Sequence, residues 1–327
     1  MKRRTWLQGL AAGWASWGIG SQAQSPSFAG RSLRLLVGYP VGGVADFIAR
    51  ITTEGLGSHL GTQVVVENKP GAAGNLAMDA VLKAAPDSGT LGMFSTLQVT
   101  MNPHVPPLAL KGSDPLRDLV PIVGLADLIL MLAVSSATQI KSLEQFMARA
   151  RQQGPDFRIG IAGIGSPHHL AILLLQKNAE LNMTLVPYKG GAPMMADAAG
   201  GHLDAVVTTL PVGQPMVQAG KLNWMATVPA VSVPSLPGLP NLAGVLKGET
   251  VPTGNGIFAP PGTSAAVAQE WHLAFKRQLE QPALAARLRA NGLEPVTGTR
   301  TQFAEKLRAE SAYMKDFLAK VQVDFSS

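Results

Sequence analysis

The sequence predicts a two-lobed α/β protein in which each lobe has a mainly parallel β-sheet flanked by helices. Its 327 residues exceed one ordinary domain and are enough for about two domains of roughly 150 residues each. Hydrophobic residues make up 46% of the chain and charged residues 15%, so each domain can bury a sizeable core. Short apolar runs alternate with helical patterns, and glycine-rich turns separate them, which is typical of β-α-β units.

The first lobe begins with three predicted strands. Apolar runs at 33–39, 64–66 and 90–96 have the length and composition of buried strands. A glycine-rich turn and a helical pattern follow each of the first two runs. A helix between consecutive strands allows them to run parallel, with helices on both faces of the sheet.

The second lobe repeats this pattern. Residues 120–134 predict one or two strands, and a helical pattern follows at 143–152. Later apolar runs at 157–162 and 184–188 are each followed by a turn and a helical pattern, and a further predicted strand lies at 205–209. The second lobe is therefore expected to resemble the first in its order of elements.

The chain is expected to cross between the lobes twice, near residue 121 and again at the start of the proline-rich stretch 229–240. The hinge should lie at these crossings, at 121–125 and 226–230. The C-terminal helices should return to the first lobe. The resulting assignment is 24–121 and 229–327 for a discontinuous first lobe and 122–228 for the second.

The composition excludes several classes of protein. The chain has no cysteine, which removes disulfides, thiolate metal sites, iron–sulfur clusters and cysteine nucleophiles. Its formal charge of +6 includes Lys2, Arg3 and Arg4; without these three, the 27 basic residues become 24 against 21 acidic ones, a net charge of +3. No basic stripe follows along the chain, so we expect no nucleic-acid partner.

Residues 1–23 have the pattern of an export signal peptide. A basic start precedes a weakly apolar stretch, and Ser21-Gln22-Ala23 has the small residues of a cleavage site. The pair Arg3-Arg4 also fits the twin-arginine export route, although ordinary leaders can start in the same way. Beyond residue 23, no uninterrupted apolar run reaches the length of about 18 residues that a transmembrane helix needs. We therefore expect an exported, periplasmic protein from which the signal peptide is removed.

Two glycine-rich turns that connect a predicted strand to a helix are the first candidates for a binding site. The turn at 38–43 precedes a helix with Asp46 near its start, and the turn at 163–166 precedes the helix that contains His169. The free backbone N–H groups and the positive end of the helix dipole favour an anion at such a position. The spacing alone is also compatible with ordinary tight βα turns.

Neither turn carries a catalytic or phosphate-binding motif. The first lacks the Lys-Ser/Thr of a P-loop and the spacing of a dinucleotide fingerprint. In the second, Ile164 stands where a nucleophile elbow requires glycine two residues before Ser166. The adjacent His168 and His169 point apart on a helix, and no third metal ligand accompanies them. We therefore predict no catalytic residue, no metal site and no cofactor.

Seven segments of the chain occur in the order found in a known family: GYPVGGVADFIAR (38–50), VVVENKPGAAGN (64–75), AAPDSGTL (84–91), GSPHHL (165–170), VPYKGGAPMMADAAGGHLD (186–204), AGKLNWMA (219–226) and FAPPGTS (258–264). In these segments the chain resembles the Bug proteins, which are periplasmic solute-binding proteins of tripartite tricarboxylate transporters. The resemblance extends from about Arg34 to the C-terminal helix. It implies a type II-like periplasmic binding protein with a ligand cleft between the lobes.

The resemblance also implies how the ligand is held. The turns at 39–43 and 163–167 would face each other across the cleft and hold carboxylates through backbone N–H groups and ordered water. The chain departs from the usual family pattern at Ser88-Gly89, at 254–256 and at His168. These departures leave the identity of the ligand open.

The candidate substrate-binding residues lie in these turns and at the ends of predicted strands: Tyr39, Val41, Gly42, Gly43, Asp46, Thr96, Gly163, Gly165, Ser166, Pro167, Tyr188 and Thr208. Asp46 is expected mainly to shape its turn, because a bare carboxylate there would repel an anionic solute. It should contact the solute only if the solute has an amino or hydroxyl group.

The predicted function is therefore capture of a small organic anion, a carboxylate, and its delivery to membrane transporter subunits by hinge closure, without catalysis. Two alternatives remain open at this stage. One is a periplasmic two-lobed α/β enzyme acting on a small carboxylate, and the other is a ligand sensor for a signalling partner such as a sensor kinase. We expect the protein to be monomeric.

Overall fold

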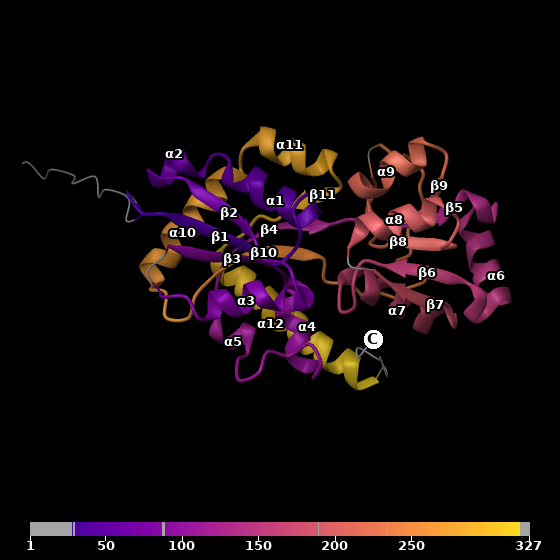
Figure 1. Ribbon diagram of the computed structural model, residues 1–327, viewed down its shortest axis with the longest axis horizontal. Helices are drawn as coiled ribbons and strands as arrows, with labels where there is room; N and C mark the ends of the chain where they lie inside the picture. The colour runs from indigo at the N-terminus through magenta and orange to yellow at the C-terminus, as the bar shows by residue number, and fades with distance from the viewer. Residues whose placement is uncertain (1–27, 29, 87–88, 189, 234, 321–327) are drawn as a thin grey trace, which may run out of the picture.

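A computed structural model describes residues 28, 30–86, 89–188, 190–233 and 235–320, and the predicted signal peptide lies outside these residues. The chain forms two lobes, each built on one β-sheet (Figure 1). The first sheet has six strands in the order β11-β4-β10-β3-β1-β2, and the second has five in the order β7-β6-β8-β5-β9. The predicted two-lobed α/β class is confirmed.

The first sheet is mixed. Its strands are β1 (Leu33–Val37), β2 (Val64–Asn68), β3 (Thr90–Ser95), β4 (Val120–Leu128), β10 (Gly254–Ala259) and β11 (Leu293–Pro295). β1 is parallel to β2 and β3, whereas β10 is antiparallel to both β3 and β4, and β11 is antiparallel to β4. The first four strands along the chain therefore share one direction, and β10 is inserted between two of them in reverse.

The second sheet has the same arrangement. Its strands are β5 (Leu130–Ser135), β6 (Arg158–Ile161), β7 (Thr184–Pro187), β8 (Ala205–Thr209) and β9 (Leu222–Thr227). β6 is parallel to β7 and β8, and β5 is antiparallel to β8 and β9. In each lobe, the reversed strand is the one that the chain forms after crossing from the other lobe. The alternation of strand and helix patterns along the chain does not indicate these reversed strands.

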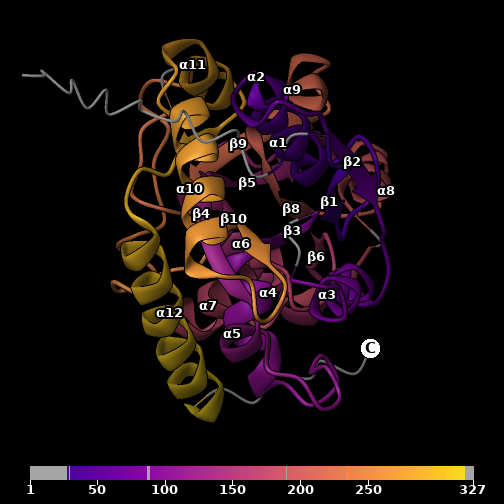
Figure 2. The ribbon, with the colours of Figure 1, turned by 90° about the vertical axis from the view of Figure 1, so that its left-hand side faces the viewer.

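Helices cover both faces of the first sheet (Figures 1 and 2). One face packs against α1 (Val44–Thr53), α2 (Leu56–Leu60), α10 (Ala265–Leu279) and α11 (Pro282–Ala290). The other face packs against α3 (Asn75–Leu82), α4 (Thr96–Met101), α5 (Pro115–Asp118) and the start of α12 (Arg300–Lys320). Of the C-terminal helices, α10 and α11 thus pack entirely on the first sheet.

The second sheet is covered in the same way. α6 (Leu143–Gln153) and α7 (Pro167–Ala179) pack on one face, and α8 (Gly191–Ala199) and α9 (Leu210–Gln218) pack on the other. Four short 3₁₀ turns complete the described elements: η1 (Ala72–Gly74), η2 (Asn102–His104), η3 (Ser136–Thr138) and η4 (Gly154–Asp156).

The two crossings between the lobes lie side by side. β4 leads into β5 through Ile129, and the N–H of Leu128 donates to the carbonyl of Thr253, just before β10, at 3.2 Å. The first crossing therefore lies at 128–130 and not near residue 121 as the sequence suggested. The reason is that β4 remains paired with β10 and β11 up to its last residues.

The second crossing is longer than predicted and belongs mostly with the second lobe. Val233 packs against Met131 and Leu210, and Leu242 and Leu246 join the second lobe's main apolar cluster. The assignment of the whole of 229–327 to the first lobe is therefore wrong for the stretch up to about residue 246.

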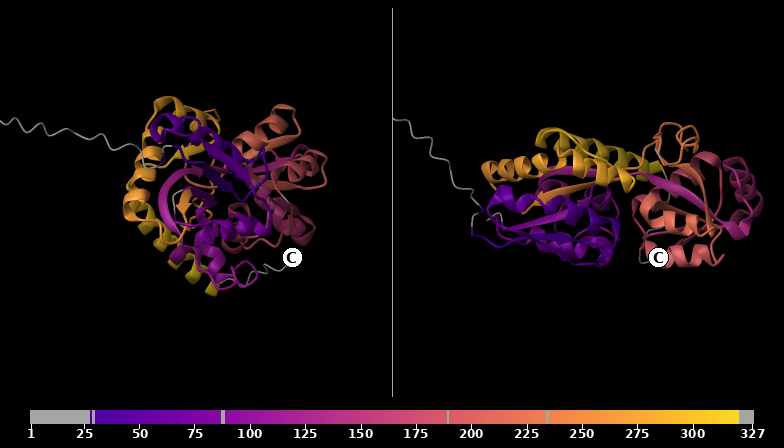
Figure 3. Two further views of the ribbon diagram at one scale, coloured as in Figure 1. Left: turned by 60° about the vertical axis from the view of Figure 1, so that its left-hand side comes forward. Right: turned by 90° about the horizontal axis from the view of Figure 1, so that it is seen from above.

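Helix α12 connects the two lobes a third time (Figure 3). Its first half places Phe303 and Leu307 in the first lobe's core. Its second half places Met314 and Phe317 in the apolar cluster that joins α4 of the first lobe to the second lobe, where the Nζ of Lys177 lies 5.4 Å from the centre of the Phe317 ring.

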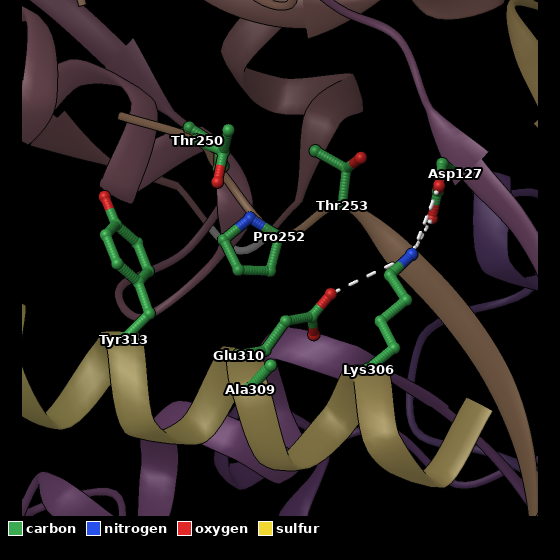
Figure 4. A pocket seen from close by; sticks show the side chains of 9 residues that line it. Asp127, Thr250, Pro252, Thr253, Lys306, Ala309, Glu310 and Tyr313 are labelled. Atoms are coloured by element: carbon green, nitrogen blue, oxygen red, sulfur yellow. Dashed lines mark hydrogen bonds and ion pairs between the residues drawn. The ribbon is translucent and has the colours of Figure 1, made fainter. Parts of the chain in front are cut away.

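A hollow of about 430 Å³ lies beside the crossings, between α12 and residues 250–253 (Figure 4). Lys306 projects from α12 and pairs with Asp127, at the end of β4, at 3.0 Å and with Glu310 at 3.8 Å. Burial raises the pKa of Glu310, although the charge of Lys306 acts in the opposite direction. The hinge thus carries a charged cluster that links α12 to the first crossing.

Gly254, where the second crossing enters β10, provides a test of this packing. A Cβ there would lie 2.8 Å from Thr96 Cγ2 and 2.9 Å from Asp127 Oδ1. Gly254→Ala should therefore lower the free energy of unfolding by about 1–3 kcal/mol, the usual cost of overpacking. Urea denaturation measures the change. Gly244→Ala is the matched control, because nothing lies within 4 Å of a Cβ at that position; equal stability of the two variants would contradict the account.

Candidate functional site

The turns that follow the strands of one lobe face those of the other lobe (Figure 1). In the second lobe, a Cβ at Gly165 would lie 2.6 Å from Leu108 Cδ1 and 3.9 Å from Asn102 Oδ1, both in the first lobe. The turn after β6 therefore lies against the first lobe. Ligands of open α/β sheets bind at this edge, beyond the carboxyl ends of the strands.

The turn after β1 is held in shape by Asp46. Gly42 has φ +80° and donates its N–H to the Asp46 carboxylate at 3.0 Å. Arg50 donates to the same carboxylate through its Nε at 3.0 Å and pairs with it through Nη2 at 2.9 Å. Burial of Asp46 opposes ionisation, but the hydrogen bonds from Arg50 and Gly42 and the charge of Arg50 outweigh burial and lower its pKa. These are the contacts of a residue that shapes the turn, while its contact with a solute stays a prediction.

The other side chains of this turn point in different directions. Tyr39 packs its ring against the first lobe's core, and burial raises its pKa to about 12. Val41 is 70% exposed. Gly43 precedes α1, and no side chain caps that helix. The first N–H groups of α1 are therefore left without a side-chain acceptor.

The turn after β6 is closed by contacts of its own. Gly163 and Gly165 have φ +114° and +73°. The Ser166 hydroxyl donates to the carbonyl of Gly163 at 2.6 Å and accepts from the N–H of His169 at 3.3 Å, and Pro167 is the first residue of α7. The N–H of Gly165 donates to His169 Nδ1 at 3.2 Å. Ser166 could therefore donate to a solute only by giving up its bond to Gly163.

Three further candidate binding residues make hydrogen bonds or packing contacts within the protein. The Tyr188 hydroxyl donates to Asp197 at 2.6 Å, and burial together with that carboxylate raises its pKa to about 12. Thr96 is buried at the start of α4, where its side chain lies beside Glu310. Thr208 is buried, and its methyl group would lie 3.0 Å from a Cβ at Gly213.

Sequence reasoning missed four buried polar residues: Ser95, Gln98, Thr209 and Asn255. Each has a side-chain polar atom that finds no hydrogen-bond partner within the described ranges. Ser95 and Thr209 are the last residues of β3 and β8, which occupy the same place in the two sheets, next to the reversed strand. The sequence contains a signal for Ser95. Side chains alternate along a strand, so Ser95 lies on the same face as the apolar Leu91 and Met93 and is expected to be buried with them. The sequence analysis chose their neighbours Thr96 and Thr208 instead.

Two negative observations apply to the described part of the chain. No three histidine or acidic side chains there are grouped closely enough to hold a metal ion. Of its helices, none has both the length and the apolar character needed to cross a membrane.

The two lobes of equal topology and their facing turns define a two-lobed binding protein of the periplasmic type. The chain belongs to the tripartite tricarboxylate transporter receptor family (TctC), whose sequence profile matches residues 48–322. The predicted resemblance to the Bug proteins is thus confirmed. BugT of Bordetella pertussis is 27% identical over 94% of this chain and 96% of its own. The "UPF0065 protein in gbd 5'region" of Cupriavidus necator is 32% identical over 98% of this chain and 100% of its own.

Solved structures show the same fold. A structure described as a periplasmic transporter has a TM-score of 0.82 at 28% identity and covers 91% of this chain and 99% of its own. The R. palustris protein Rpa4515 with adipate has a TM-score of 0.81 at 27% identity and covers 89% of this chain and 97% of its own. These similarities confirm the predicted type of two-lobed fold.

Acidification should weaken the turn after β6. Burial lowers the pKa of His169 to about 4. A histidine whose pKa is depressed on folding stabilises the protein fully above the unfolded value of about 6.5, and this contribution is lost as the pH falls toward 4. The free energy of unfolding should therefore fall by up to about 1.4 kcal/mol per pH unit in this window for this one group. His169→Asn keeps an acceptor for Gly165 without titrating, so its dependence should be shallower; an unchanged slope in denaturation at several pH values would refute this.

Asp46→Asn tests the role of the Asp46 carboxylate. The variant keeps an oxygen for the Gly42 N–H but loses the charge that faces Arg50, so it should be less stable by roughly 1.5 kcal/mol. Its affinity for a carboxylate should stay within about tenfold of the wild type, or 1.4 kcal/mol. Calorimetric titration and thermal unfolding measure the two effects. A far larger loss of affinity with unchanged melting would show that Asp46 contacts the solute directly.

Proposed function

We propose that this protein is a periplasmic solute-binding protein that captures a small carboxylate between its lobes and delivers it to the membrane subunits of a tripartite tricarboxylate transporter. The observation that carries the proposal is the lack of a side-chain cap on α1, α8 and α9, which begin where strands end. α7, which begins after β6, differs because Ser166 caps it. Elsewhere, α5, α6 and α10 are capped by Asp114, Ser142 and Ser264.

Uncapped helix starts favour an anionic ligand. Their first N–H groups lack intrahelical acceptors, and the helix dipole adds a partial positive charge at the same place. The one carboxylate in the first turn of α1, Asp46, is paired with Arg50 and does not present an unbalanced negative charge. Adipate, with which the similar R. palustris protein was solved, is a dicarboxylate.

The contacts of Ser166 and His169 support binding without catalysis. The Ser166 hydroxyl donates to the carbonyl of Gly163, and His169 Nδ1 accepts from the N–H of Gly165. The pair therefore lacks the serine-to-histidine hydrogen bond that activates a nucleophile. A periplasmic location is supported by the leader pattern at 1–23 and by the receptor family.

Capture would involve rotation of the lobes about the adjacent crossings at 128–130 and 247–253. These crossings are hydrogen-bonded to each other, so they can act as one hinge. α12 would stay with the first lobe, because it packs against α4 and η2 and the Ser311 hydroxyl lies 2.8 Å from His104 Nε2. Small-angle scattering should then show a smaller radius of gyration when the ligand is bound.

Gly43→Val tests the proposed function directly. Gly43 has φ −80°, and the nearest atom to a Cβ there is the carbonyl oxygen of Pro40 at 3.4 Å, so the variant should fold. Its branched side chain would cover the first N–H groups of α1 and should abolish binding. The solute released from natively purified protein, identified by mass spectrometry, is the probe; at 100 times its dissociation constant it should stabilise the wild type by about 2.7 kcal/mol.

Gly244→Val, on the exposed surface, is the matched control and should bind like the wild type. Stabilisation of the wild type by neutral sugars or cations alone would contradict the proposal. So would full affinity of the Gly43→Val protein.

A further inference from the structure

We propose that Ser95 and Asn255 form a subsite in the first lobe that donates hydrogen bonds to an oxygen at the far end of the solute, and thereby decide which carboxylates bind. This inference rests on the proposed function and concerns the specificity of the same site. It is carried by two buried polar side chains that the protein itself leaves without partners.

Ser95 behaves unlike the other serines that precede helices in the described structure. Ser142, Ser166 and Ser264 each accept a hydrogen bond from the first turn of the helix that follows. Ser95 stands in the same position before α4 but makes no such bond. Its hydroxyl is buried and has no partner among the described residues. The hydroxyl is therefore available for another acceptor.

Asn255 provides the second donor. It lies directly opposite Ser95 in the antiparallel register of β3 and β10, and side chains so paired share one face with Cβ atoms about 4.5–5.5 Å apart. Asn255 is 4% exposed, and its Nδ2 has no partner within the described ranges. Two neighbouring unpartnered donors match one acceptor oxygen, because the Asn amide nitrogen and the Ser hydroxyl can each donate to it.

The position of the pair connects it to the proposed site. Met93 and Ile257, which share the face of Ser95 and Asn255, pack in the same cluster as Ile48 of α1. β1 is parallel to β3, with Val37 opposite Met93, so the turn after β1 passes beside Ser95. The pair therefore lies on the α1 side of the sheet, next to the uncapped start of that helix.

The second lobe has only half of this arrangement. Thr209 ends β8 as Ser95 ends β3, and its hydroxyl is also buried without a partner in the described structure. The residue opposite Thr209 is Leu130, which cannot form hydrogen bonds through its side chain. A solute oxygen that needs two donors would therefore lie in the first lobe.

The experiment compares dicarboxylates with monocarboxylates of equal length: adipate with hexanoate, glutarate with pentanoate, and succinate with butyrate. Titration calorimetry should show that wild-type protein binds a dicarboxylate at least about tenfold more tightly than its partner acid. In Asn255→Leu and Ser95→Ala, this advantage should shrink to about threefold or less through loss of dicarboxylate affinity alone. The control is Asn223→Leu, which makes the same substitution near the start of β9 in the second lobe. This variant should keep the wild-type preference.

Thermal unfolding without ligand gives a second, independent readout. Asn255→Leu replaces an unpartnered polar group by an apolar one of similar size, so its melting temperature should be unchanged or higher. A lower melting temperature with an unchanged preference would mean that Asn255 is structural, and it would overturn the subsite. Equal affinity of wild-type protein for both acids of every pair would overturn the subsite while leaving the carboxylate function intact. Binding of no acid in any pair would overturn both.

Discussion

The proposed site depends on one constraint, which is that a helix follows each of β1, β2 and β3 in the first lobe and each of β6, β7 and β8 in the second. This connection places the helix starts at one edge of each sheet, and those edges face each other. Because α1, α8 and α9 have no side-chain cap, their N–H groups remain without internal acceptors. The paired Asp46 and Arg50 keep the turn before α1 in shape without adding net charge. These features favour the binding of an anion without a dedicated cationic side chain.

The reversed strands β5 and β10 tie the two lobes together. Each is the first strand formed after a crossing; β10 lies between β3 and β4, and β5 lies between β8 and β9. This position brings the crossings side by side and places Asn255 opposite Ser95. The same strand thus serves the hinge and the proposed subsite. α12 adds a third connection, whose charged cluster around Lys306 lies at the first crossing.

Much of the fold could be predicted from the sequence, because strand and helix patterns alternate and the glycine-rich turns mark their junctions. The first crossing was misplaced, because Pro121 and Gly124, the turn-forming residues of the apolar run at 120–134, lie inside β4, whereas the crossing at 128–130 contains neither proline nor glycine. For the site, the sequence located the two turns but could not show which hydrogen-bonding groups are already used. Ser166 and Tyr188 are occupied by Gly163 and Asp197, whereas Ser95 is not. Such differences depend on contacts between distant segments.

The most direct test of the central claim is a crystal structure of the natively purified protein with the solute that it retains. We predict that a carboxylate of the solute lies within hydrogen-bonding distance of the N–H groups at the start of α1 and contacts the turn at 163–166 of the opposite lobe. A solute bound elsewhere, for example in the hollow beside Lys306, would contradict the account.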